Sequence, residues 1–248
     1  MQQRDFHLRR MEQFLRHARG SGRPGGGDSP RPSLTISRQC GTRCSEISRG
    51  LVEYLSEIDE SATHGWAYFG QALIGKLIEE QKLLCSKPHF RIDSLKFPVS
   101  ERLVDCLGKT NSPETLFDRC SEMIRKLCHS GNAVVAGRAG NFVTADLPNT
   151  FHVRLIGSPE SRIAYTRNRY RYSDEEARHV VKQVDESRSK FVKRHADADI
   201  SDSSSYHMVI NTDQISNDKL IRIIGDSLIE WAAEPNLSSS ITPFPQAH

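Results

Sequence analysis

Apolar positions along the chain fall into short continuous runs separated by longer segments with a helical period. Four short, β-prone runs predict buried strands: 33–37 (SLTIS), 133–136 (AVVA), 151–156 (FHVRLI) and 207–210 (HMVI). Helices are predicted between and after them, around Ile47 to Leu55 and over 73–84, 113–128, 159–170, 174–195 and 217–233. Strands alternating with helices predict a mainly parallel sheet covered on both faces, with ligands bound at the carboxyl ends of its strands.

Local capping signals support two of these helix boundaries. Ser158 followed by Pro159 gives a capping hydroxyl and a first-turn proline. Ser173 and Glu176 have the spacing of a capping box.

The chain divides into three parts by pattern. Residues 1–32 combine a loose helical stripe over 4–18 with a Gly/Pro-rich linker, residues 33–233 form the predicted α/β domain, and residues 234–248 form a Ser/Pro-rich flexible tail. The N-terminal helix is expected to dock on the domain or on a partner, or to be a frayed appendage; the pattern leaves these alternatives open.

Composition narrows the class of protein. The chain has 248 residues, 37% hydrophobic and 26% charged, which is enough for a substantial core, and its net charge of +3 is too small for a dedicated nucleic-acid binder. Six cysteines lack metal-ligand or redox spacing, so no metal site is expected and reduced thiols in a cytoplasmic protein fit best. No apolar stretch reaches the roughly 20 residues that span a bilayer, so no membrane partner is expected.

The loop between the first predicted strand and its helix is the default ligand site. Main-chain N–H groups at a helix start attract anions, and the helix dipole adds to this attraction. The segment from Ser37 to Glu46 does not match the G-x-x-x-x-G-K-[ST] phosphate loop, which uses glycines for a tight cradle and a lysine for the β- and γ-phosphates.

Five segments in consistent order nevertheless resemble one family. They are ISRQCGTRCSEI, GNAVVAGRAGNFV, VRLIGSPESRI, SDEEARHVVKQVDESRSKF and YHMVINT. Together, from about Ser33 to Ile229, they resemble the cytidylate-kinase-like family of bacterial P-loop proteins. The resemblance implies a three-layer α/β nucleoside-monophosphate-kinase fold with a mainly parallel five-stranded sheet, an acceptor-binding helical insert before the GR motif, and an arginine-rich helical lid.

The resemblance assigns the nucleotide to the first loop. Relatives usually read ISRE-x-GSGG-x-EI there, and only Gly41 of those glycines is present in this chain. Arg38 or Arg43 is a candidate for the missing cation, because guanidinium binds phosphate oxygens in a bidentate manner. The alternative is a structural remnant that binds no nucleotide. The predicted nucleotide-binding residues are Arg38, Gly41, Thr42, Arg43, Cys44, Ser45 and Glu46.

Gly137 and Arg138 follow the AVVA strand and are the predicted acceptor-binding residues. The glycine admits close approach and the arginine can clamp an acceptor phosphate. True cytidylate kinases resemble this segment as GRD, whereas Ala139 replaces the acid here, so specificity for cytidine is not implied. Alternatively, Arg138 pins the strand end to a neighbouring carboxylate.

An arginine-rich segment corresponds to the lid that the resemblance implies, beginning near Asp185. Phosphoryl transfer needs positive charge around the moving group, which Mg²⁺ and closing arginines supply. The predicted catalytic residues are Arg162, Arg167, Asp185 and Arg188. Two alternatives stay open: these charges form a solvated helix face, or they bind RNA together with the interleaved tyrosines.

The sequence therefore predicts an ATP-dependent kinase that phosphorylates a nucleoside monophosphate (CMP-like) or a related small acceptor, with Mg²⁺ carried by the nucleotide. The expected partners are the nucleotide and a small phosphate acceptor. A protein that kept the fold and senses nucleotides, or serves as a scaffold, without catalysis is the second hypothesis. An RNA-associated factor is the third and weakest.

Overall fold

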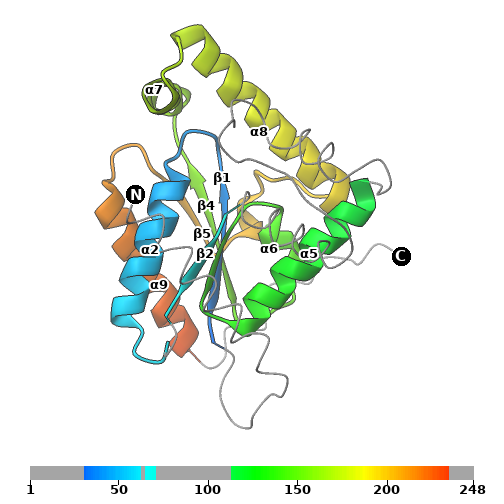
Figure 1. The fold of residues 1–248 in the computed structure, drawn as a ribbon, viewed down its shortest axis with the longest axis vertical. Helices are drawn as coiled ribbons and strands as arrows, with labels where there is room; N and C mark the ends of the chain where they lie inside the picture. Colours follow the sequence, from blue (N-terminus) through cyan, green and yellow to red (C-terminus); the bar gives the residue numbers. More distant parts are fainter. Residues whose placement is uncertain (1–30, 63–64, 71–112, 235–248) are drawn as a thin grey trace, which may run out of the picture.

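The computed structural model describes residues 31–62, 65–70 and 113–234 (Figure 1). The predicted helices at 4–18 and 73–84 and the predicted flexible tail lie outside these residues. The described elements, in chain order, are β1 (Ser33–Arg38), α2 (Cys44–Ile58), β2 (Ala67–Phe69), α5 (Pro113–Ser130), β3 (Ala133–Ala136), α6 (Gly140–Val143), β4 (Thr150–Ile156), α7 (Pro159–Tyr170), α8 (Asp174–Ala196), the 3₁₀ turn η2 (Ser203–Ser205), β5 (Met208–Asn211) and α9 (Asn217–Ala233).

The five strands form one parallel sheet in the order β2-β3-β1-β4-β5. β1 is central, with Ile36 opposite Ala136 of β3 and Arg38 opposite Leu155 of β4. The chain moves to one side of β1 for β2 and to the other for β4, which opens a crevice at the carboxyl ends of the central strands. The predicted parallel α/β sheet is confirmed, and its central crevice lies directly after Arg38.

Each face of the sheet is covered by helices. Leu34 and Ile36 of β1 pack with Leu51 of α2 and with Leu220 and Ile224 of α9 on one face. On the other face the cluster belongs mainly to β2, α5 and β3: Phe69, Ile124, Leu127, Ala133 and Val135. The alternation of side chains along β3 explains this split, because neighbouring residues of a strand point to opposite faces.

Helices α7 and α8 project beyond the sheet and meet at its carboxyl end (Figure 1). The Ser158 hydroxyl accepts from the N–H of Ser161, and Ser173 with Glu176 forms the reciprocal capping box, so both capping predictions are confirmed. Near the C-terminal end of α8, Phe191 packs edge-on against Phe117 of α5, with ring centroids 5.7 Å apart. Helix α8, which contains the predicted lid, therefore extends from the crevice to α5, the helix that covers the second face of the sheet.

Two small elements were missed by the sequence pattern. β2 has three residues, and the four-residue helix α6 begins after Ala139. Neither is long enough to show a period of its own. The family resemblance, by contrast, implied a fifth strand.

The buried His152 of β4 and the partly buried His207 before β5 lie side by side, with ring centroids 5.1 Å apart. The side chains of Thr35 and His152 are joined by a hydrogen bond of 2.7 Å, and His207 Nδ1 accepts from the main-chain N–H of His152 at 2.9 Å. Burial lowers the pKa of His152 to about 3, with the neighbouring His207 as a second cause, and burial lowers the pKa of His207 to about 4.

We expect this pair to make the fold acid-sensitive. In the unfolded chain both imidazoles take up protons near pH 6.5, whereas in the folded protein they do so only well below that. The unfolded state then binds more protons, so stability falls as pH decreases from about 6.5 toward 4, by about 2–3 kcal/mol between pH 7 and 4.5 from the buried His152 and by a smaller amount from the partly exposed His207. Urea unfolding across this range measures the loss, which His152→Gln should reduce. Stability that stayed flat over this range would contradict the account.

Candidate active site

The loop after β1 has the backbone form of an anion-binding turn. Gly41 has φ of 85° and Arg43 has φ of 55°, while Thr42 between them and Cys44 after them are not among the residues with positive φ. Such alternation of backbone conformation turns successive N–H groups toward one side and forms a concavity that holds anions. The helix dipole of α2, which begins at Cys44, adds positive character.

The main-chain amides of this loop divide into bonded and unbonded groups. The N–H of Gln39 donates to the Leu155 carbonyl at 3.0 Å, and that of Cys40 donates to Asp185 Oδ1 at 2.7 Å. Within the described residues, no acceptor takes a hydrogen bond from any of the next five amides, Gly41 to Ser45. Five consecutive donors at the amino end of a helix therefore lack an acceptor among the described residues, and a helix start of this kind is suited to an anion.

Gly41 is required by close packing as well as by its φ. A Cβ there would lie 2.4 Å from the carbonyl oxygen of Arg162, a main-chain atom that cannot easily move. Thr42 is buried, and its hydroxyl donates to the Gln39 carbonyl at 3.0 Å. The loop is thus shaped by its own contacts and by the start of α7.

Two residues predicted to contact the nucleotide point elsewhere. The Arg43 guanidinium donates to the carbonyls of Thr212 and Ile215, the latter at 2.9 Å, so it ties the loop to the β5–α9 connection. Glu46 accepts from the Tyr165 hydroxyl at 2.8 Å and from Asn217 Nδ2 at 3.2 Å. In this structure both side chains fasten α2 to its neighbours, and contact of Arg43 or Glu46 with a nucleotide stays a prediction.

Cys44 and Ser45 lie at the start of α2. The Cys44 sulfur is 3.7 Å from the Ser48 hydroxyl and packs against the core, whereas Ser45 is exposed and its side chain bonds to Tyr68 of β2. Their main-chain amides, rather than their side chains, are the groups available to a ligand. Tyr68 was not predicted, because its strand was not.

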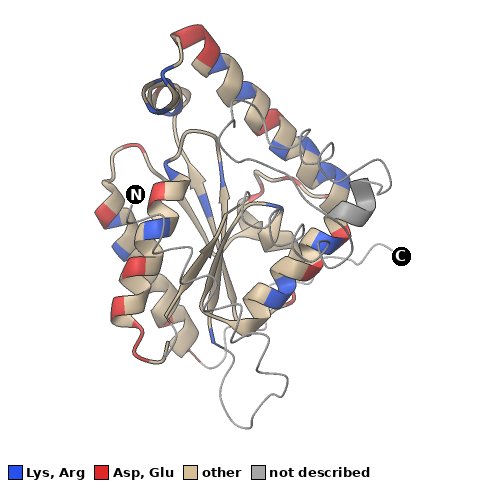
Figure 2. Ribbon diagram, viewed as in Figure 1, with Lys and Arg blue, Asp and Glu red and all other residues tan. Residues whose placement is uncertain are grey.

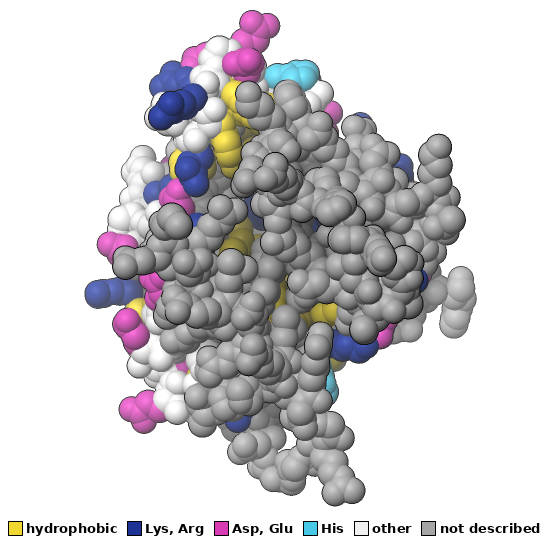
Figure 3. All heavy atoms as spheres, viewed as in Figure 1, with side chains coloured by type: hydrophobic (Ala, Val, Ile, Leu, Met, Phe, Trp, Pro, Cys, Tyr) yellow, Lys and Arg dark blue, Asp and Glu magenta, His cyan; other side chains and the backbone are white. Residues whose placement is uncertain are grey.

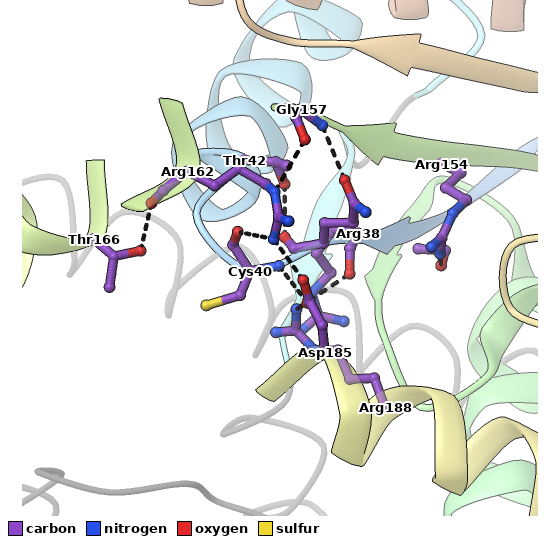
Figure 4. A network of polar contacts seen from close by, with 11 residues as sticks. Arg38, Cys40, Thr42, Arg154, Gly157, Arg162, Thr166, Asp185 and Arg188 are labelled. Carbon is purple, nitrogen blue, oxygen red and sulfur yellow. Dashed lines mark hydrogen bonds and ion pairs between the residues drawn. The ribbon is translucent and has the colours of Figure 1, made fainter. Parts of the chain in front are cut away.

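Arg162 and Asp185 form a buried clamp behind the loop (Figure 4). Arg162 donates from Nε to the Gly157 carbonyl at 3.0 Å, and from Nη1 to the Cys40 carbonyl at 3.2 Å and to Asp185 Oδ2 at 2.5 Å. Asp185 in turn receives the Cys40 amide. Their polar atoms join β4, the loop and α8, which favours a positioning role, and a direct catalytic role for either residue stays a prediction.

Arg188 extends from the lid to the end of β1. Its Nη1 donates to the Arg38 carbonyl at 3.1 Å and lies 3.6 Å from Asp185 Oδ1. Burial lowers the pKa of Arg188 to about 10, and the nearby Arg38 adds to the effect. The predicted lid arginine is therefore held close to the phosphate loop.

Arg38 crosses from β1 to the end of β3. A Cβ on Gly137 would lie 1.9 Å from Arg38 Nη1, so the glycine leaves room for this guanidinium. Arg138 follows, and its Nε and Nη2 are buried and meet no acceptor within the described residues. Burial, and then Arg38, lowers the pKa of Arg138. No described carboxylate pairs with Arg138, so the alternative that it pins the strand end is not supported there.

The backbone at this strand end is strained. Gly137, Arg138 and Ala139 have φ of 90°, 59° and 55°, a left-handed conformation that costs non-glycine residues energy. Strain of this kind persists where the surrounding structure holds it, often at binding sites. It holds Arg138 at the crevice beside Arg38.

Arg167 lies apart from these residues. It pairs with Asp174 at 2.7 Å across the α7–α8 junction, where the two side chains are 45% and 66% exposed. Basic and acidic side chains are interspersed along the outer edge of the lid (Figures 2 and 3), as on an ordinary solvated surface. The structure does not bring Arg167 to the other predicted catalytic residues.

A cavity of about 190 Å³ opens beside the arginines. Its lining includes Arg38, Arg154, Asp185, Arg188, Asp199 and Ser201. Arg154 was not among the site residues predicted from the sequence. The signal for it was a single charge inside the apolar run FHVRLI, where a buried arginine needs a partner.

The described residues contain no cluster of three or more His, Cys, Asp or Glu side chains that could hold a metal ion. In the same part of the chain, no helix combines the length and the apolar character needed to cross a bilayer.

Comparison with known proteins agrees with this architecture. The model of the cytidylate kinase-like family matches residues 33–214. No curated protein gives a significant match. An uncharacterized protein from Eubacterium ventriosum ATCC 27560 is similar in structure, with a TM-score of 0.60 and 14% identity over 81% of this chain and 99% of its own.

Two enzymes show weaker similarity. Shikimate kinase from Bacteroides thetaiotaomicron has a TM-score of 0.49 and 12% identity, covering 80% of this chain and 98% of its own. A gluconokinase from Sinorhizobium meliloti 1021 has a TM-score of 0.43 and 10% identity, covering 83% of this chain and 95% of its own.

Proposed function

We propose that this chain, which belongs to the cytidylate kinase-like family, is a nucleotide-dependent phosphotransferase acting on a small phosphate-bearing or otherwise anionic acceptor. The observation that carries the proposal is the run of five unbonded amides, Gly41 to Ser45, beside the guanidinium groups of Arg38 and Arg188. Amides and arginines at one crevice are the elements that phosphoryl transfer requires. Its four free thiols within the described residues fit a cytoplasmic protein.

In this proposal the loop amides hold the triphosphate of ATP. An acceptor oxygen attacks the γ-phosphorus in line, the bond from that phosphorus to the β–γ bridging oxygen breaks, and ADP leaves. Arg188 and Arg38 stabilise the charge on the moving group, and Arg138 binds the acceptor's anionic group. Arg162 and Asp185 act as positioning residues that hold the loop beneath the lid.

The donor set around the loop does not fit a protein-held Mg²⁺. Glu46 stands where a Walker loop has its metal-binding Ser or Thr, and both of its oxygens are engaged. Mg²⁺ would therefore arrive on the nucleotide phosphates, where it neutralises their charge.

Thermal-shift titration with ATP and Mg²⁺, followed by measurement of ADP formation with candidate acceptors, tests the proposal. A rise in melting temperature with ATP concentration, together with acceptor-dependent ADP formation, is the expected result. Absence of any stabilisation by nucleoside triphosphates would contradict it.

A second candidate function is nucleotide sensing without catalysis. It is favoured by Ala139, which leaves no acid at the end of β3, and by the structural engagement of Arg43 and Glu46. Stabilisation by ATP without ADP formation for any acceptor would favour this candidate over the kinase.

We expect Gly41→Ala to weaken ATP binding at least tenfold, because the added Cβ meets the Arg162 carbonyl and disfavours φ of 85°. Gly131→Ala is the matched control, because Gly131 has φ of 78° and an added Cβ would approach main-chain atoms of Arg31 as closely as 2.8 Å. Gly131 lies just before β3, at the amino ends of the strands and away from the loop. Both variants should lose stability, but calorimetry should find ATP affinity reduced only in Gly41→Ala. Equal ATP affinity in the two variants would contradict the loop assignment.

A further inference from the structure

Arg154 is a buried charge that the proposed phosphoryl transfer does not use. Its residue is only 6% exposed, and no described carboxylate lies within ion-pairing distance of its guanidinium. Its direct contacts are neutral: Nη1 donates to the Ser37 hydroxyl at 2.8 Å, and its Cζ lies 5.6 Å from the centroid of the Tyr206 ring. Asp199, which lines the same cavity, interacts with Arg154 only from beyond ion-pairing distance. A buried charge without a directly paired opposite charge is costly, and a bound anion would offset that cost.

The surroundings hold Arg154 in a fixed position. The Tyr206 hydroxyl donates to the Ile200 carbonyl at 2.8 Å and lies 3.3 Å from the Ser37 hydroxyl, so the ring and the serine are themselves anchored. In Figure 4, Arg154 lies on the opposite side of Arg38 from Arg162 and Cys40. A rigid, preorganised guanidinium is suited to bind a carboxylate or phosphate through two parallel hydrogen bonds.

Charge in the cavity is unbalanced toward positive. Three arginines line it, Arg38, Arg154 and Arg188, against two acids, Asp185 and Asp199. Both acids already accept hydrogen bonds from the protein: Asp185 from Cys40 and Arg162, and Asp199 from the main-chain N–H and hydroxyl of Ser201 at 2.8 and 2.6 Å. Arg138 adds a further charge next to Arg38. The cavity lining alone therefore has one more positive than negative charge, and Arg138 beside Arg38 raises the excess to two, which suits a ligand with more than one negative charge.

The same cavity is poorly suited to a nucleoside. Ile200 is its one apolar lining residue among the described residues, so there is little surface on which a base could pack. Its volume of about 190 Å³ is below the roughly 300–1,000 Å³ typical of sites for drug-sized ligands. Ala139 leaves the end of β3 without a carboxylate to accept hydrogen bonds from a sugar.

We propose that the acceptor is a small non-nucleoside molecule with two anionic groups, one held by Arg138 and the second, a carboxylate or phosphate, held by Arg154. This inference rests on the proposed phosphotransferase function and specifies its substrate class. Arg38 lies between the two anion positions, since it contacts Gly137 at the end of β3 and also lines the cavity.

Calorimetry on the full chain tests the inference with three probes. 3-Phosphoglycerate carries a phosphate and a carboxylate, glycerol 3-phosphate is its analogue without the carboxylate, and CMP is the nucleoside monophosphate. Each is titrated in the presence and absence of a non-hydrolysable ATP analogue with Mg²⁺. We expect 3-phosphoglycerate to bind at least about tenfold more tightly than glycerol 3-phosphate, because a charge-assisted pair is added. CMP should bind more weakly than 3-phosphoglycerate.

Variants locate the second anion. Arg154→Gln should bring the affinity for 3-phosphoglycerate down to that for glycerol 3-phosphate without changing the affinity for the ATP analogue. Arg154→Lys, which keeps the charge, covers the case in which the glutamine variant does not fold, and should keep part of the preference. Arg178→Gln is the control. Arg178 is exposed and lies about 15 Å before Arg188 along α8, so its substitution should leave all affinities unchanged.

Two results would overturn the inference: equal binding of the two glycerol compounds by the unmodified protein, or a preference that survives in Arg154→Gln. Tighter binding of CMP than of 3-phosphoglycerate would also overturn it. Failure of the phosphotransferase proposal has a separate signature, the absence of binding by the ATP analogue, which is measured independently of the acceptor preference.

Discussion

Arg188→Ala is expected to lower the turnover number by about 10²–10³-fold while changing the dissociation constant for ATP by less than about threefold. The reason is the position of Arg188 on the lid, where its Nη1 lies against the Arg38 carbonyl. A guanidinium there acts mainly on charge that develops as the phosphoryl group moves, and little on the ground-state nucleotide. Steady-state kinetics, with direct titration of ATP, separates the two quantities.

Arg178→Ala is the matched control for this prediction. Arg178 is exposed on the same helix and does not line the cavity, so the variant removes the same charge from α8 without touching the crevice. Its turnover should stay within about twofold of the unmodified protein, as expected for a surface substitution. Equal losses of turnover and ATP affinity in Arg188→Ala would argue against a lid role and for a simple binding role.

Arg162→Ala is expected to destabilise the fold by about 2–3 kcal/mol. The Arg162 side chain is 10% exposed and makes contacts with Gly157, Cys40 and Asp185. Removing it leaves the Asp185 carboxylate, 25% exposed, without its closest cation and leaves two carbonyls without a donor. Chemical unfolding monitored by circular dichroism measures the change.

Arg167→Ala provides the contrast on the same helix. Its ion pair with Asp174 is largely exposed, so the substitution should cost no more than about 0.5–1 kcal/mol. If Arg162→Ala proved no more damaging than Arg167→Ala, the buried clamp would not be holding the loop and the lid together. A large loss of activity without loss of stability in Arg162→Ala would restore it to a direct role in catalysis.

Most of the architecture followed from periodicity alone. The segments around Leu34, Val134 and Val153 are continuous apolar runs, and the long helices have clear helical stripes and capping residues, so local pattern and tertiary structure agree. β2 was missed because three residues, Ala67 to Phe69, give no period, and its place in the sheet depends on pairing with β3. Short elements are defined by their neighbours rather than by their own sequence.

The site was only partly predictable, because side-chain direction depends on distant partners. Arg43 occupies the loop as expected, yet its guanidinium turns to carbonyls 169 and 172 residues further along the chain. Asp185 was assigned to catalysis from the lid pattern, but it accepts the Cys40 amide from 145 residues away. No local pattern encodes such contacts.

Arg154 is the opposite case, because the local sequence did indicate an unusual residue. One charged residue inside a buried strand demands an explanation, since arginine is rarely buried without a partner. The groups that contact it, Ser37 and Tyr206, come from other strands and loops. The sequence therefore indicated a buried charge but could not identify its partners.

The central claim is that the loop amides from Gly41 to Ser45 bind the phosphates of a nucleoside triphosphate. A crystal structure of the full chain with a non-hydrolysable ATP analogue and Mg²⁺ tests it most directly. The account predicts phosphate oxygens within about 3.2 Å of several of these amide nitrogens, with Arg188 turned toward the γ-phosphate. A fully occupied analogue bound elsewhere, with none of these amides in contact with its phosphates, would contradict it.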